Sequence, residues 1–107
     1  MSASDEAVAS TLRVEGEMTI YRAAELKPEL LAALDASVTL RLDLSGVTEL
    51  DTAGVQILMM LKAHAQANER ALELVAHSPA VLEVFELLNL AAYFGDQLPI
   101  ATPRTAH

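Results

Sequence analysis

The segment from Val38 to Leu44 constrains the fold most strongly, because apolar and polar residues alternate along it without a break. It reads V-T-L-R-L-D-L, with four apolar residues separated by three polar ones. In an extended chain, successive side chains point to opposite faces, so this pattern predicts a β-strand with one buried face and one wet face. A sheet of this kind is typical of a two-layer domain, in which helices cover the apolar face.

Extended and helical patterns alternate along the rest of the chain. Helices are predicted at residues 23–36 and 52–68, and a third begins at Ser78-Pro79 and stops at Asn89, since Ser is a good N-cap and Pro fits the first turn. Another short strand is predicted at residues 72–76.

Two short alternating runs precede the first helix, and Gly16 lies between them. The runs, 12–15 and 18–20, predict a β-hairpin. The element order is then β-β-α-β-α-β-α, with right-handed strand–helix–strand crossovers. The sequence thus predicts an α/β fold: a mixed four-stranded sheet with helices packed mainly on one face.

Length and charge define the class of protein. The 107 residues are enough for one domain, predicted at 11–95 between a frayed N-terminus (1–10) and a loose tail (96–107). The net charge of −8 argues against binding to nucleic acid or anionic lipid. The chain contains no cysteine, which excludes disulfides, thiolate catalysis and cysteine-type zinc sites.

The sequence also predicts where in the cell the protein is found. Asp5 and Glu6 stand where a signal peptide would carry basic residues, and no apolar run approaches the ~18 residues of a membrane span. We therefore expect a soluble cytoplasmic protein without direct membrane insertion.

The segment Leu50-Asp51-Thr52-Ala53-Gly54 lies where a loop enters the second helix. Asp51 or Thr52 can act as its N-cap, and this structural role alone would explain the pair. The alternative is functional, because the free amides and partial positive charge of a helix N-terminus suit a hydroxyl that carries a phosphate. The same letters occur in small GTPases, but the chain has no G-x-x-x-x-G-K-[ST] loop.

The second predicted helix has an unusual outer face. A buried stripe is formed by Gly54, Leu58, Leu61 and Ala65, and the opposite side and its flank carry Gln56, Met59, Met60, Ala63 and Gln66. Only Lys62 is charged between Thr52 and Asn68. The face is either an ordinary helix surface with no binding role or a partner-binding patch that uses adaptable methionines.

No catalytic or metal-binding constellation is predicted. His64 and His77 are 13 residues apart, which is no metal-ligand spacing. Asp43 and Asp51 could approach each other at one end of the sheet, but without a nucleophile or metal partner they read as loop and cap residues. We expect no enzyme activity, no cofactor and no metal.

Residues 43–55, D-L-S-G-V-T-E-L-D-T-A-G-V, resemble the signature of STAS domains, the fold of bacterial anti-sigma factor antagonists. The resemblance extends to the segments 16–20, 72–81 and 87–90 and to Phe94, so it covers residues 11–95. The family's order of strands and helices matches the order predicted above.

The resemblance implies a non-catalytic signalling protein that regulates transcription. It maps the phosphorylation site of a partner kinase onto Thr52, where the family more commonly has Ser. The predicted partner-contact residues are Asp51, Thr52, Ala53, Gly54, Gln56, Met59, Met60 and Ala63. We expect a monomer or weak dimer that binds a regulatory kinase, an anti-sigma factor or another ATPase.

Two other roles remain open on the same resemblance. The STAS subunit of the lipid-asymmetry ABC transporter binds an ATPase, and there Thr52 would be an interface residue only. Stand-alone STAS proteins of chemotaxis clusters are similar too.

Overall fold

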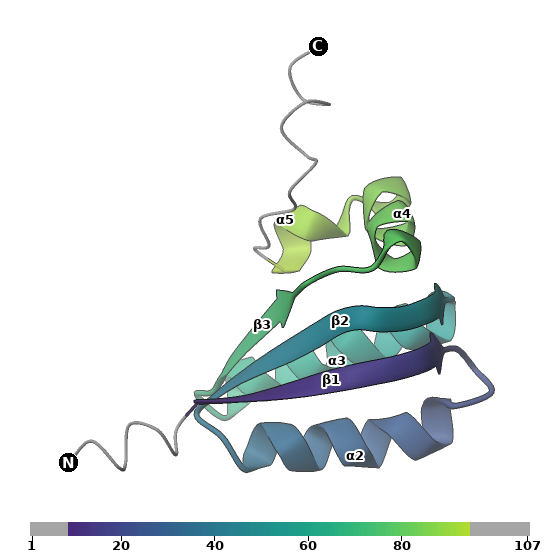
Figure 1. Ribbon diagram of the computed structural model, residues 1–107. Helices are drawn as coiled ribbons and strands as arrows, with labels where there is room; N and C mark the ends of the chain where they lie inside the picture. Colours follow the sequence, from purple (N-terminus) through teal and green to yellow (C-terminus); the bar gives the residue numbers. More distant parts are fainter. Residues whose placement is uncertain (1–8, 95–107) are drawn as a thin grey trace.

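The computed structural model describes residues 9–94 (Figure 1). Its elements, in chain order, are β1 (Ala9–Met18), α2 (Ala23–Asp35), β2 (Thr39–Leu50), α3 (Thr52–Ala67), β3 (Ala71–Val75), α4 (Pro79–Leu88) and α5 (Leu90–Phe94). The predicted tail at 96–107 lies outside the described residues. So does the predicted frayed N-terminus, except that Ala9 and Ser10 belong to β1.

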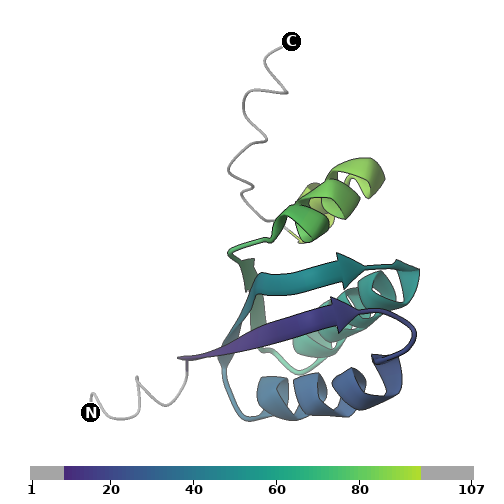
Figure 2. The same ribbon diagram turned by 45° about the vertical axis from the view of Figure 1, so that its right-hand side comes forward.

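The described strands form a parallel sheet in the order β1-β2-β3. Leu42, in the first half of β2, lies in register with Leu12 of β1 and Leu74 of β3. Both crossovers step in the same direction across the sheet, so right-handed connections place α2 and α3 on the same face, where the two helices contact each other. Helix α4 packs on β2, and α2 and α4 lie at opposite ends of the molecule with the strands between them (Figures 1 and 2).

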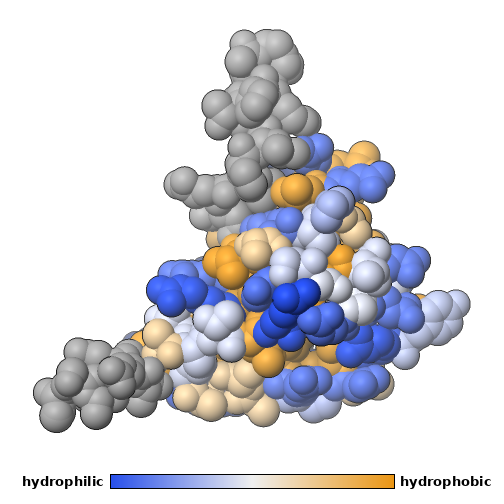
Figure 3. Space-filling view, in the orientation of Figure 1, coloured by the Kyte–Doolittle hydropathy of each residue, from blue (hydrophilic) through white to orange (hydrophobic). Residues whose placement is uncertain are grey.

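The predicted alternation is confirmed from Thr39 to Leu44, but Val38, the first apolar residue of the predicted strand, precedes β2 and is 49% exposed. Leu40, Leu42 and Leu44 are buried, while Arg41 and Ser45 are exposed. In the orientation of Figure 1, α3 lies behind the strands, and hydrophilic side chains cover much of the face turned toward the viewer (Figure 3). The sheet is therefore apolar toward the helices and polar on its other face.

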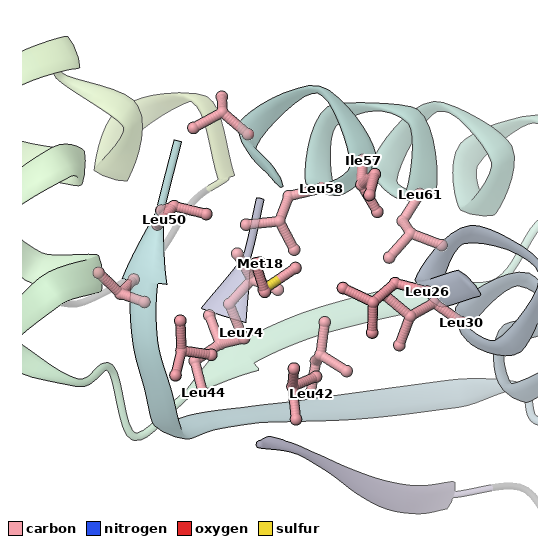
Figure 4. Packing of buried hydrophobic residues seen from close by; sticks show 14 of the residues in the cluster. Met18, Leu26, Leu30, Leu42, Leu44, Leu50, Ile57, Leu58, Leu61 and Leu74 are labelled. Carbon is pink, nitrogen blue, oxygen red and sulfur yellow. The ribbon is translucent and has the colours of Figure 1, made fainter. Parts of the chain in front are cut away.

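The core lies between this apolar face and the helices. Figure 4 shows side chains of all three strands meeting side chains of α2 and α3. The predicted stripe of α3 is confirmed, since Gly54, Leu58, Leu61 and Ala65 are all buried.

The hairpin predicted around Gly16 is wrong. The chain continues through Gly16 as the single strand β1, and its pairing with β2 shifts register on both sides of this residue. Gly16 has φ +85°, a conformation that costs glycine little and other residues more. It therefore makes a bulge rather than a reversal. A fourth, antiparallel strand is not among residues 9–94, where the sheet is three-stranded and parallel.

The connector predicted at Ser45-Gly46 is also wrong, because β2 runs on to Leu50. A Cβ atom on Gly46 would lie 2.8 Å from the carbonyl oxygen of Val14, so glycine lets the two strands stay close at this point. The strand prediction stopped early because a Ser-Gly pair usually marks a turn.

The predicted ends of the third helix are confirmed. The Ser78 hydroxyl accepts a hydrogen bond from the Val81 amide at 3.2 Å, and Asn89 ends α4 in the left-handed conformation with φ 55°. The short helix α5 that follows was not predicted. Among the described helices, none combines the length and apolarity that a membrane crossing requires.

Candidate partner-binding site

The site lies at the carboxyl end of β2, where the chain passes directly into α3. Asp51 is the N-cap of α3: its backbone is extended, and its Oδ1 accepts a hydrogen bond from the Gly54 amide at 3.0 Å. Thr52 is the first helical residue and its side chain is exposed. Within the described part of the chain, the Thr52 hydroxyl makes no hydrogen bond. Asp51 thus does the capping, and the hydroxyl beside it faces solvent.

Asp51 also holds the loop between β1 and α2 by hydrogen bonds. Its Oδ2 accepts a hydrogen bond from the Ile20 amide at 3.1 Å, and its own amide donates to the Met18 carbonyl at 3.3 Å. Asp51 therefore joins the ends of two neighbouring strands to the first turn of α3, through its backbone amide and both carboxylate oxygens.

The environment keeps Asp51 ionised. Desolvation by its surroundings raises the pKa of this carboxyl, but hydrogen bonds from the backbone amides of Gly54, Ile20 and Ala53 act in the opposite direction. Together these bonds outweigh desolvation and hold the pKa below its ordinary value of 3.8. At neutral pH a negative charge stands next to Thr52.

Gly54 is required by a close approach of α3 to β1. A Cβ atom at this position would lie 2.2 Å from the Met18 carbonyl oxygen and 2.6 Å from Cδ1 of Leu50. Gly54 is buried, so it belongs to the packing that supports the site rather than to its surface. Ala53, beside it, is half-buried.

The outer face of α3 is less open than predicted. Gln56 and Ala63 are exposed, but Met59 and Met60 are half-buried and pack against the core. Helix α2 lies against α3, and Met60 lines a hollow there with Lys27, Gln56 and Ile57. Full exposure of the two methionines is therefore a wrong expectation, because neighbouring elements cover part of both side chains.

Sequence reasoning missed two residues beside this site. Ile20 and Tyr21, in the loop after β1, are 67% and 87% exposed. Ile20 was assigned to the second strand of the predicted hairpin, on the apolar side of its alternation. The available signal was position: both residues lie between a strand end and a helix start, where a large apolar pair is uncommon.

The two aspartates do not form one centre. Asp43 lies within β2, opposite Arg13 in the register, and accepts a hydrogen bond from the Ser45 amide at 2.9 Å. Hydrogen bonds from Ser45 lower the pKa of Asp43, and the charge of Arg13 adds to this effect. Across residues 9–94, no three histidine, aspartate or glutamate side chains gather as a group that could hold a metal ion.

Comparison with known families places this geometry in context. The family model described as "Mlab, STAS domain" matches residues 1–98, which is most of the chain. The chain belongs to the STAS domain family. A comparison with curated proteins gave no match.

Solved structures with the same fold include several anti-sigma factor antagonists. An anti-sigma factor antagonist from Mycobacterium paratuberculosis is 27% identical with a TM-score of 0.69, over 92% of this chain and 85% of that one. The unphosphorylated form of the anti-sigma factor antagonist SpoIIAA is 18% identical with a TM-score of 0.67, over 94% and 89%. The phosphorylated form of the Bacillus cell fate determinant SpoIIAA is 16% identical with a TM-score of 0.62, over 94% and 93%. This STAS domain therefore has an anti-sigma-factor-antagonist-like fold.

Proposed function

We propose that this STAS domain is a non-catalytic cytoplasmic regulator that binds a protein kinase or anti-sigma factor, and that phosphorylation of Thr52 switches the binding off. One observation carries the proposal: the Thr52 hydroxyl is exposed at the first position of α3, while Asp51 performs the capping. A residue that caps its own helix would have its hydroxyl engaged. Here the hydroxyl is available to a kinase.

The position suits a phosphate. A phosphoryl group adds about −1.5 to −2 charge and three acceptor oxygens. The dipole of the α3 N-terminus stabilises that charge, so the domain itself would rearrange little. The ionised Asp51 carboxylate adds a like charge beside the phosphate. The change is then felt mainly by a partner whose surface is shaped for a neutral hydroxyl.

The comparisons support this proposal. One similar structure is named as an unphosphorylated anti-sigma factor antagonist, and another as a phosphorylated form. The proposed contact surface is the exposed rim of the site, formed by Asp51, Thr52, Ala53, Gln56, Ala63 and the accessible parts of Met59 and Met60. Gly54 supports this rim from inside.

The name Mlab in the family description favours a second candidate. In that role the domain is a permanent accessory subunit that binds the ATPase of a lipid-type ABC transporter. Thr52 would then be an unmodified interface residue.

Affinity purification from the native cytosol, followed by mass spectrometry, tests the two candidates together. The switch predicts a kinase or anti-sigma factor as the retained partner, and a fraction of the protein with phosphate on Thr52. Recovery of a transport ATPase with unmodified Thr52 would support the accessory subunit and contradict the switch.

A further inference from the structure

The loop between β1 and α2 displays two large apolar side chains although its backbone is firmly held. The Thr19 carbonyl accepts from the Arg22 amide at 2.9 Å, and the Thr19 hydroxyl accepts from the Tyr21 amide at 3.3 Å and donates to Glu17 at 2.6 Å. Thr19 itself is buried. The loop is therefore fixed from within, while Ile20 and Tyr21 point outward.

Arg22 holds the same loop from the other side. Its Nη1 donates to the carbonyl oxygens of Glu15 at 2.7 Å and Glu17 at 3.0 Å. These bonds tie the beginning of α2 to the end of β1. Tyr21 lies between Thr19 and Arg22, whose hydrogen bonds hold the loop, so ordering its backbone on binding would cost little further entropy.

Such a loop has the properties of a binding anchor. Exposed aromatic side chains on a rigid backbone are frequent hot spots of protein interfaces, because a ring buries a large area for few rotatable bonds. The fold gains little from Tyr21, whose side chain is 87% exposed.

The loop is continuous with the Thr52 site through one side chain. Asp51 accepts from the Ile20 amide with one oxygen and from the Gly54 amide with the other, at 3.1 and 3.0 Å. Thr52 follows directly in the sequence. The loop and the start of α3 are thus held as one surface.

This surface is acidic around its apolar centre. Glu17 lies opposite Glu49 in the register of β1 and β2, and Asp51 follows the end of β2. Glu25 stands in the first turn of α2 with its side chain exposed. Arg22 forms an ion pair with Glu25 at 3.9 Å, and Lys27 lies beside Gln56 at the hollow between α2 and α3, so four acidic residues stand against two basic ones. Charge complementarity therefore calls for a partner with basic residues around an apolar pocket.

We infer that Ile20 and Tyr21 form the second half of the partner-binding surface, with Tyr21 as its anchor and Asp51 as the positioning residue that holds the two halves together. The inference rests on the proposed function. The occupant is the same regulatory protein, bound through an apolar pocket with a basic rim that receives the Tyr21 ring.

Site-specific photo-crosslinking tests the inference in cells that naturally contain the protein. Benzoylphenylalanine replaces Tyr21, Gln56 or, as a control, Val38, which is 49% exposed at the opposite end of β2. We expect positions 21 and 56 to capture the same protein and position 38 not to capture it. Thr52→Glu should remove both products.

The captured protein is then purified and titrated calorimetrically. Tyr21→Ala should weaken binding about 10-fold or more, while Tyr21→Phe and Val38→Ala stay within about twofold. The thermal midpoint should be unchanged in all three variants. Affinity should fall as salt is added, since the rim contacts are electrostatic.

The outcomes separate the inference from the proposed function. Capture at position 56 alone, with wild-type affinity for Tyr21→Ala, would overturn the inference and leave the proposed function standing. Salt-independent affinity would contradict the basic rim. Absence of a captured protein at both positions would contradict the proposed function, and the inference with it.

Discussion

At the scale of residues, three neighbouring residues at the start of α3 have different roles. Asp51 caps the helix, Thr52 presents a hydroxyl, and Gly54 allows α3 to approach β1. The sequence predicts a capped helix here but leaves Asp51 and Thr52 as alternative caps. The structure assigns the cap to Asp51 through the local bond from the Gly54 amide. Asp51 accepts a second bond from the Ile20 amide, which is 31 residues away along the chain and brought close only by the fold.

The role of Asp51 predicts a measurable loss of stability. Asp51→Ala should lower the free energy of unfolding at pH 7 by about 1 kcal/mol, because the Gly54 and Ile20 amides lose their acceptor. Urea denaturation followed by circular dichroism measures the change.

The same carboxylate gives this loss a pH dependence. The folded protein holds the pKa of Asp51 below its ordinary value of 3.8, so its stabilisation is complete above that pH and is lost as the pH falls further. The difference between wild type and Asp51→Ala should therefore shrink in acid. A difference that stays constant down to pH ~2 would contradict the assigned hydrogen bonds.

Gly54 makes a second prediction at this scale. Gly54→Ala should destabilise the protein by about 1–3 kcal/mol, since the new methyl group would collide with the Met18 carbonyl. Gln56→Ala, at an exposed position in the same turn, is the matched control and should change stability by less than about 0.5 kcal/mol. Equal stability of both variants would rule out the close approach of α3 to β1.

At the scale of elements, periodicity predicted what local patterns can specify. The alternation from Thr39 to Leu44 in β2 and the apolar stripe of α3 are confirmed, because burial imposes those periods directly on the sequence. Gly16 and Ser45-Gly46 misled the prediction. Glycine permits a turn, a bulge or a close strand contact, and only the pairing of β1 with β2 decides among them.

The central strand can be tested by placing a charge in it. Leu42→Asp should destabilise the protein by roughly 3–5 kcal/mol, because Leu42 is fully buried among apolar side chains. Val38→Asp, just before the same strand and half exposed, should have a small effect. Thermal and urea unfolding of the two variants give the comparison. A Leu42→Asp midpoint within a degree of wild type would make the strand assignment wrong.

At the scale of the whole molecule, the parallel sheet explains where the site lies. The carboxyl ends of β1 and β2 lie at the same edge, so the loop carrying Tyr21 and the start of α3 carrying Thr52 are neighbours. The predicted hairpin at Gly16 assigns Ile20 to a strand, so it does not place this loop beside Thr52. This is why the sequence led to a prediction for Thr52 and the outer face of α3 but to none for Ile20 and Tyr21.

The affinity of two Thr52 variants for the purified partner tests the proposed switch most directly. Thr52→Glu should weaken binding about 100-fold or more, because a bulky carboxylate would be buried without a partner at a contact shaped for a hydroxyl. Thr52→Ala should keep or tighten binding, and both variants should unfold at the wild-type midpoint. Weakening by Thr52→Ala alone is the pattern of the accessory subunit. Wild-type affinity for both variants would contradict any role of Thr52 in binding.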